Sequence, residues 1–334
     1  SSRLGARRWA GLVAPGATQP RASWGRPLAS PGLGLAGVRG AGAALWGQRT
    51  DETERPIVIA SKQFSEQYIL AQMIGQRLEA AGYAVEYRDG LGSAVVHSAV
   101  ASSSIDISVD YTGTIWTNYL NRSDNPGREA MYETIRDWEW RQNGVKVLGR
   151  LGFENAYAFA MRGDRAKELG VTSLTDLVGK APQLTVGGDP EFFERPEWLA
   201  VRDAYGLRFR QSRNFAPTFM YNALQSGEAD VISAYTSDGR IAADKLVVLT
   251  DPKGALPSYD ALLMLSPRIA EDKGVIAALE PLLGAISVEA MREANLAVDR
   301  EDAKKLTPKA AAAELLRTIH RRPGLDPGPL TPKN

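Results

Sequence analysis

The sequence predicts an α/β protein with two lobes, each built on a parallel-type sheet flanked by helices. Three observations support this fold class. From residue 56 to about 265, short apolar runs alternate with segments of helical periodicity, which is the order expected of strands connected by helices. The chain has 334 residues, enough for about two domains. Its composition, 44% apolar and 24% charged, is ordinary for a globular protein with a sizeable core.

The first predicted elements begin at Pro56. The apolar run 56–60 is typical of a buried parallel strand. Ser65 is expected to cap the helix that follows, and Gly82 is expected to end it. Within this helix, apolar residues recur at helical spacing, namely Leu70, Met73, Ile74, Leu78 and Ala81. The next elements predicted are two strands and a helix between them, at 83–87, 105–109 and about 94–102.

The same alternation continues beyond a helix at about 126–143. Further strands are predicted at 145–149, 156–161, 184–187, 229–234, 246–250 and 261–265. Helices are predicted at about 191–205 and 217–226, and residues 267–319 are expected to be mostly helical, ending in a helix at 310–319. The tail at 323–334 has four prolines and no periodicity, so we expect it to be frayed.

Residues 1–50 have a different composition from the remainder of the chain. They contain seven arginines, ten glycines and four prolines, but no lysine or acidic residue. Because glycine and proline interrupt every helical or strand period, we predict a disordered leader outside the fold. The leader resembles an export or transit segment in its charge, although Arg39 and several glycines interrupt the apolar stretch that a signal peptide needs. A GxGxxG pattern at 32–37 lacks the flanking strand and helix of a dinucleotide site.

The composition also excludes several kinds of chemistry. The chain has no cysteine, which excludes disulfides, thiolate zinc sites, Fe–S clusters and cysteine nucleophiles. Its two histidines, His97 and His320, have no metal-ligand partner three or four residues away. No Walker A or GxSxG motif occurs, and no apolar run is long enough to predict a transmembrane helix. We therefore expect no catalytic residues, no cofactor and no metal site.

Charge argues in addition against nucleic-acid binding. Beyond the leader, the chain holds 33 basic and 39 acidic residues, so its body is mildly acidic. A protein that binds the phosphate backbone without specificity needs a basic surface.

Four tyrosines lie where predicted strands meet loops: Tyr111, Tyr157, Tyr235 and Tyr259. A single tyrosine is most often a half-buried packing residue. Four of them at strand ends are less easily explained by packing, because strand ends form the edges of a cleft between two lobes. The sequence therefore predicts that the cleft is lined by tyrosine.

Four motifs resemble the signatures of one protein family and follow one another in the family's order. They are SKQFSEQYIL at 61–70, DYTGT at 110–114, GFENAYA at 152–158 and YTSDG at 235–239. The family is that of the substrate-binding proteins of glycine betaine, choline and carnitine ABC importers. Segments 115–118 and 191–198 are most similar to its osmoprotectant branch, called OsmF or YehZ. The resemblance extends from about 56 to 268, and the helical C-terminus is consistent with it to about 320.

The resemblance implies a type II periplasmic-binding-protein fold whose lobes close on a quaternary ammonium compound. In this family tyrosine rings form a cage around the trimethylammonium group, and by motif position the cage is Tyr111, Tyr157, Tyr235 and Tyr259. The chemistry suits such a ligand, because trimethylammonium has no N–H donor and offers only diffuse charge and methyl surface. Each ring face contributes roughly 0.5–2 kcal/mol to binding of a cation.

The resemblance also implies polar contacts to the ligand. Arg195 matches the residue that clamps the ligand carboxylate, Lys62 and Thr114 match supporting donors, and Asn155 lies beside the cage. Two cations in the site favour a zwitterion such as glycine betaine over choline, which has no carboxylate to neutralise them. The alternatives are that Arg195 pairs with Glu191 or Glu194 of its own helix and that Lys62 is a solvated loop charge.

The resemblance sets the expected organisation and partners. Lobe 1 is expected to be discontinuous, 56–151 plus 259–320, and lobe 2 to span 152–258, with hinges near 152–156 and 250–258. We expect a monomer, located in the periplasm or otherwise outside the cytoplasm, that delivers its ligand to the membrane subunits of an ABC permease.

Three alternative functions remain open at this point. The first is a receptor for choline, carnitine, a polyamine or an amino acid. The second is a ligand-sensing regulatory domain of the same fold, which needs a DNA-binding helix-turn-helix that residues 1–50 cannot form. The third is an enzyme on this scaffold, for which no pair of nucleophile and base is evident.

Overall fold

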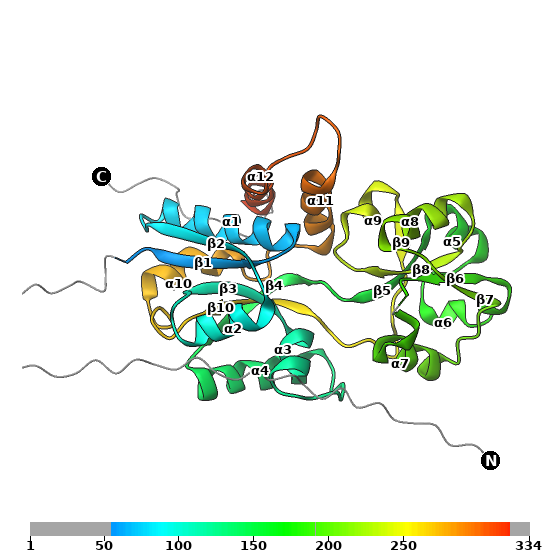
Figure 1. Ribbon diagram of the computed structural model, residues 1–334, viewed down its shortest axis with the longest axis horizontal. Coiled ribbons are helices and arrows are strands. Elements are labelled where there is room, and N and C mark those ends of the chain that lie inside the picture. The colour runs from blue at the N-terminus through cyan, green and yellow to red at the C-terminus, as the bar shows by residue number, and fades with distance from the viewer. Residues whose placement is uncertain (1–54, 191, 321–334) are drawn as a thin grey trace, which may run out of the picture. The chain divides into compact units, whose positions relative to one another are not determined.

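The computed structural model describes residues 55–190 and 192–320 (Figure 1). The predicted disordered leader at 1–50, the predicted frayed tail at 323–334 and the possible ion-pair partner Glu191 lie outside the described residues.

The first sheet has five strands in the order β2-β1-β3-β10-β4. Strand β1 is parallel to β2 and β3, whereas β10 is antiparallel to both β3 and β4. The strand bounds are β1 Ile57–Lys62, β2 Val85–Leu91, β3 Ile107–Tyr111, β4 Lys146–Glu154 and β10 Asp260–Leu265.

The second sheet also has five strands, in the order β7-β6-β8-β5-β9. Strand β6 is parallel to β7 and β8, and β5 is antiparallel to β8 and β9. The strand bounds are β5 Tyr157–Arg162, β6 Thr185–Gly188, β7 Gln211–Asn214, β8 Val231–Tyr235 and β9 Leu246–Val248.

The sheets are therefore mixed rather than parallel, which corrects one part of the predicted fold class. Strands β5 and β10 are the antiparallel members, and each is the first strand that the chain forms after passing from one sheet to the other. No helix lies on either passage. A helical crossover is what returns a chain parallel to its previous strand, so these two strands are free to enter in the opposite direction.

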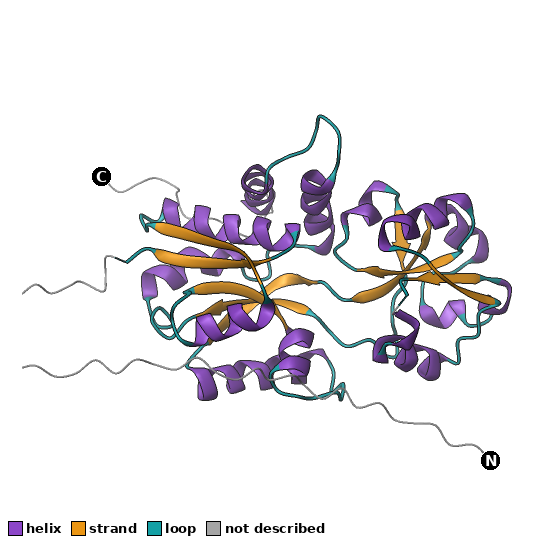
Figure 2. Ribbon diagram, viewed as in Figure 1, coloured by secondary structure: helices purple, strands orange, loops and turns teal. Residues whose placement is uncertain are grey.

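Helices cover both faces of the first sheet, as Figure 2 shows. Along β1, Ile57 and Ile59 belong to the core under one set of helices, and Val58 and Ala60 to the core on the opposite face. The first set is α1 Ser65–Ala80, α10 Lys273–Leu279, α11 Val288–Asp299 and α12 Pro308–His320, and the second is α2 Ser93–Ala101, α3 Thr112–Asn118 and α4 Arg128–Asn143. The alternation explains why β1 is apolar throughout, because both of its faces are buried.

The second sheet has its own apolar cores. One surrounds Phe159, Phe192 and Trp198, and the other lies under α8. The helices here are α5 Gly163–Leu169, α6 Leu174–Leu177, α7 Pro196–Tyr205, α8 Pro217–Ser226 and α9 Gly239–Ala243. Three short 3-10 turns complete the described elements, at Ala181–Gln183, Phe192–Glu194 and Glu280–Leu282.

The prediction that Ser65 caps α1 is wrong. The cap position is Phe64, which has no side-chain cap bond, and the Ser65 hydroxyl donates to Asp299 on α11 instead. The predicted end is confirmed, because Gly82 follows the helix with φ of +92°. The N–H of Tyr83 donates to the Leu78 carbonyl at 3.0 Å, so Tyr83 belongs to the end of the helix. Strand β2 therefore begins at Val85 rather than at the predicted residue 83.

Three further differences from the predicted elements have local causes. Strand β7, with the sequence QSRN, is a polar and largely exposed edge strand without an apolar signal. Helix α3 begins with Thr-Gly-Thr, a poor helix-forming sequence, and was not predicted. Helix α7 begins at Pro196 rather than 191, because proline fits the first turn of a helix and cannot stand in its interior.

Of the helices in the described part of the chain, none combines the length and the apolar character needed to span a bilayer.

Candidate ligand-binding site

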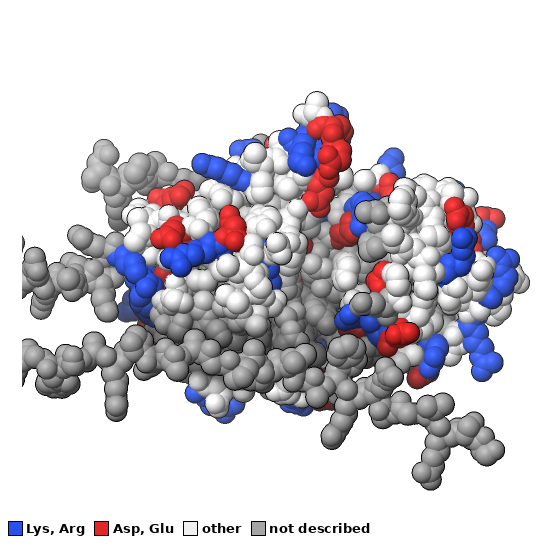
Figure 3. Space-filling view, viewed as in Figure 1, with Lys and Arg blue, Asp and Glu red and all other residues white. Residues whose placement is uncertain are grey.

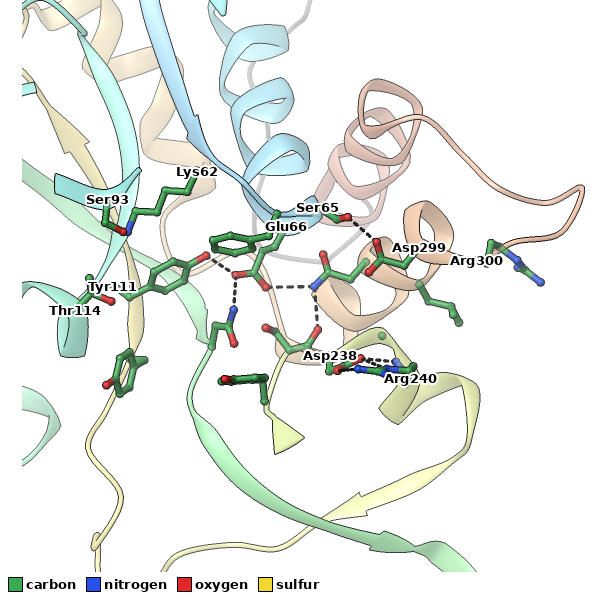
Figure 4. A pocket seen from close by; sticks show the side chains of 18 of the residues that line it. Lys62, Ser65, Glu66, Ser93, Tyr111, Thr114, Asp238, Arg240, Asp299 and Arg300 are labelled. Carbon is green, nitrogen blue, oxygen red and sulfur yellow. Dashed lines mark hydrogen bonds and ion pairs between the residues drawn. The ribbon is translucent and has the colours of Figure 1, made fainter. Parts of the chain in front are cut away.

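A cavity of about 990 Å³ is lined by segments of both sheets and by α11 (Figure 4). From the first sheet come the end of β1, the first turn of α1 and the starts of α2 and α3. The loop between β8 and α9 contributes from the second sheet. The cavity therefore lies at the carboxyl ends of β1, β3 and β8, which is where open α/β sheets bind ligands.

Six of the eight predicted site residues line this cavity: Lys62, Tyr111, Thr114, Asn155, Tyr235 and Tyr259. Tyr157 and Arg195 are not among the lining residues. Figure 4 shows Lys62, Tyr111 and Thr114 on one side, with Glu66 between them and Asp299.

Tyr157 packs against Tyr235, and Arg195 packs against Tyr157. The Tyr235 hydroxyl donates to the Tyr157 hydroxyl at 3.2 Å, and the two ring centroids are 4.9 Å apart. Burial raises the pKa of Tyr157. The Arg195 guanidinium lies 4.9 Å from the centroid of the Tyr157 ring, and its Nε is 3.2 Å from Glu197 Oε2. In this arrangement Arg195 supports Tyr157, and its role as a carboxylate clamp stays a prediction.

Tyr111 is held by its hydroxyl group. The hydroxyl donates to the carboxylate of Glu66 and accepts from Gln67 Nε2 at 3.1 Å. Its ring stacks on Phe64 at 6.3 Å between centroids, with Lys62 Nζ 5.4 Å from the ring centroid. Burial raises the pKa of Tyr111 well above its ordinary value, and the neighbouring Glu66 carboxylate adds to the rise.

Lys62 is not a solvated loop charge, so that alternative is wrong. It is the last residue of β1, and its Nζ lies 2.6 Å from Oδ1 of Asp110 on β3, with both side chains buried. A buried ion pair keeps its two charges fixed, because separating them leaves an uncompensated charge away from water.

Glu66 is a cavity residue that the sequence reasoning missed. It is only 3% exposed, and Asn155 Nδ2 and Asn295 Nδ2 each donate to its carboxylate at 3.2 Å. Burial raises the pKa of Glu66, and hydrogen bonds from Tyr111 and its other neighbours oppose the rise. An acidic residue in the first turn of a helix is an ordinary dipole partner, so its place in the SKQFSEQYIL motif was the one available signal.

Helix α11 connects the two sides of the cavity. Its residues Met291 and Val298 pack in the core of the first sheet. From the same helix, Arg292 Nε donates to the Thr236 carbonyl at 2.6 Å and Asn295 Nδ2 to the Ser237 carbonyl at 2.9 Å, both just after β8. The sequence predicted that residues 267–319 are mostly helical, but not this contact.

Tyr259 lies flat on Gly113. A Cβ atom at Gly113 would be 2.5 Å from Cζ of the Tyr259 ring, so only glycine allows the ring its position. We expect Gly113→Ala to displace the ring, to lower stability by about 1–3 kcal/mol and to weaken ligand binding by about tenfold or more. Thermal unfolding and calorimetric titration measure the two effects. Gly92→Ala is the control, because a Cβ there meets nothing within 4 Å; equal losses in both variants would contradict the prediction.

The family model described as the substrate-binding domain of ABC-type glycine betaine transport systems, OpuAC, matches residues 55–318. A glycine-betaine-binding protein of Pseudomonas aeruginosa is 32% identical over 275 residues, which cover 78% of this chain and 87% of the relative. The ergothioneine transport permease/ergothioneine binding protein EgtU of Helicobacter pylori is 29% identical over 283 residues, 83% of this chain. The match covers 50% of EgtU, so the chain spans half the length of that relative.

Solved structures agree with the fold. A glycine betaine/carnitine/choline ABC transporter structure has a TM-score of 0.74 at 26% identity, over 79% of this chain and 98% of the other. Apo YehZ from Escherichia coli has a TM-score of 0.70 at 25% identity, over 78% of this chain and 98% of the other. The predicted two-lobed α/β fold is thereby confirmed. The predicted family is also confirmed, and its members are binding proteins rather than enzymes. This chain belongs to the family of substrate-binding domains of ABC-type glycine betaine transport systems.

Proposed function

We propose that this protein is the solute-binding component of an ABC importer, and that it captures a quaternary ammonium compound such as glycine betaine, choline or carnitine outside the cytoplasm. Membership of the family supports the transport role. The glycine-betaine-binding relative, at 32% identity, supports the class of ligand.

The observation that carries the proposal is the grouping of tyrosines around one cavity. Tyr111, Tyr235 and Tyr259 line it, and Tyr157 packs against Tyr235. A trimethylammonium group has no donor hydrogen, so ring faces are the protein groups that attract it without a competing need for hydrogen bonds. We propose these four tyrosines as the ammonium cage, with Lys62, Thr114 and Asn155 as the polar side of the site.

Transport requires that the site open and close, and the chain path supports a hinge. Among the described residues, the chain passes between the sheets after β4 and again after β9. We propose lobes of 56–151 plus 259–320 and of 152–258, rotating about these two passages, with the closed form docking on the permease as a monomer.

Calorimetric titration of the protein with glycine betaine, choline, carnitine and ergothioneine tests the proposal. Ergothioneine is included because the relative EgtU is an ergothioneine binding protein. Saturable binding of at least one of these compounds supports the proposal. A folded protein that binds none of them, while binding a polyamine or an amino acid, would overturn the proposed ligand class and leave the family standing.

The carboxylate-clamp prediction for Arg195 has its own test. If Arg195 binds the ligand carboxylate, Arg195→Ala should weaken glycine betaine binding by about tenfold or more and leave choline binding nearly unchanged. If Arg195 acts only by supporting Tyr157, both ligands weaken by the same small factor. Titration of the variant with both ligands decides between the two roles, and Arg202→Ala, on the helix that follows Arg195, serves as the control.

A further inference from the structure

Glu66 is a buried carboxylate in the cavity with which no basic side chain of the described residues forms an ion pair. Its hydrogen-bond donors are the Tyr111 hydroxyl and the side-chain amides of Asn155 and Asn295, all of them neutral groups. Within residues 55–190 and 192–320, Glu66 takes part in no ion pair, and the hydrogen bonds that lower its pKa against the effect of burial come from neutral side chains. A buried charge normally has a partner of opposite charge, so this carboxylate stands out.

The basic side chains that line the cavity are already paired with acids. The described lining contains three of them: Lys62 pairs with Asp110 at 2.6 Å, Arg240 with Asp238 at 3.0 Å and Arg300 with Asp302 at 2.6 Å. The same described lining contains four acidic residues, Glu66, Asp238, Asp299 and Glu301. The cavity therefore offers an excess of negative charge.

We propose that Glu66 determines specificity, selecting a quaternary ammonium ligand with a net charge of +1, such as a quaternary ammonium alcohol, over a net-neutral betaine. The inference rests on the proposed function and names the ligand subclass. A cationic ligand supplies the positive partner that the Glu66 carboxylate lacks. Their attraction is strong because water is excluded from a buried carboxylate. A betaine brings its own carboxylate a few bonds from its ammonium group, so attraction at one end is offset by repulsion at the other.

Hydrogen bonding points to the same ligand. The side-chain oxygens of Asn155 and Asn295 are buried and accept no hydrogen bond from the described residues. Together with Glu66, they make this wall of the cavity rich in acceptors. Glycine betaine has no donor hydrogen, whereas the hydroxyl of a quaternary ammonium alcohol is a donor.

The part of the cavity lining at the end of α11 carries further acidic groups. Asp299 and Glu301 belong to it, and Asp302 follows in the loop between α11 and α12. Figure 3 shows acidic side chains gathered over this loop, with basic ones beside them. The zwitterion preference predicted from Lys62 and Arg195 assumed two unpaired cations, and here both are paired with acids.

Titration of the wild type, Glu66→Gln and the control Glu271→Gln with choline and glycine betaine tests the inference. Glu271 is exposed and distant in sequence from the lining residues. We expect the wild type to bind choline about tenfold or more tightly than glycine betaine. In Glu66→Gln, choline binding should fall by about ten- to a hundredfold and glycine betaine binding by about threefold or less, so that the preference disappears. Glu271→Gln should keep the wild-type values.

Several outcomes overturn the inference. Equal weakening of both ligands by Glu66→Gln, or tighter binding of glycine betaine by the wild type, excludes a charge-selecting role while the proposed function stands. A wild type that binds neither compound overturns this inference, and the titrations with carnitine and ergothioneine then decide the proposed function separately. If Glu66→Gln fails to fold, titration of the wild type is the test. The wild type should bind choline at least about tenfold more tightly than glycine betaine, and at least about tenfold more tightly than the uncharged analogue of choline in which carbon replaces the ammonium nitrogen.

Discussion

Tyr235→Ala should weaken binding of a quaternary ammonium ligand by about a hundredfold, equivalent to about 2–3 kcal/mol. Tyr235 lines the cavity and is 46% exposed, so its ring face is available to a ligand. Its removal also takes away the hydroxyl that donates to Tyr157 and the ring that packs on it. Because the side chain is half exposed, stability should change by no more than about 0.5 kcal/mol. Calorimetric titration and thermal unfolding of the variant measure the two quantities separately.

Tyr235→Phe is the matched control for that experiment. Phenylalanine keeps the ring and loses only the hydrogen bond to Tyr157, so binding should stay within about threefold of the wild type. If the phenylalanine variant binds as poorly as the alanine variant, the hydroxyl rather than the ring recognises the ligand, and the cage proposal is wrong.

Lys62→Ala should lower the free energy of unfolding by about 3–5 kcal/mol, because it leaves Asp110 buried without its partner. Both side chains are almost fully buried, and the Lys62 Nζ to Asp110 Oδ1 distance is 2.6 Å. The loss should appear in denaturant unfolding without any ligand present. This measurement distinguishes a structural charge pair from a lysine that serves only the ligand.

The double variant Lys62→Met, Asp110→Asn completes the test. It removes both charges while keeping most of the side-chain volume, so it should recover at least about half of the stability lost in Lys62→Ala. If Lys62→Ala unfolds like the wild type but no longer binds ligand, the pair contributes nothing to folding and Lys62 acts on the ligand directly.

Much of the fold could be predicted from local sequence. The β1 run is apolar because both faces of the strand are buried, and the helical spacing of Leu70, Met73, Ile74 and Leu78 follows from one buried face of α1. The errors arose where local signals compete. Ser65 had the right residue type for a cap, but a hydroxyl bonds the nearest good acceptor, here Asp299 on a helix more than two hundred residues away.

The candidate site was likewise predicted only in part from the sequence. Tyrosines at strand ends indicated the cavity wall, and six predicted residues line it, because strand ends converge at one edge of a sheet. The pairing of charges was beyond reach of the sequence. Lys62 and Asp110 are on neighbouring strands, and Arg195 faces Glu197 and Tyr157, so two cations expected to bind a ligand carboxylate are already engaged.

The sequence by itself determined the α/β class, most of the elements and the family. These depend on periodicity and on short motifs, which are properties of residues close together in the chain. Only the tertiary structure decided which charges are neutralised, and it did so by bringing Glu66, Asn155 and Asn295 together from α1, the passage between the sheets and α11. The net charge of a cavity is a sum over side chains from distant segments and depends on burial, so no local pattern records it.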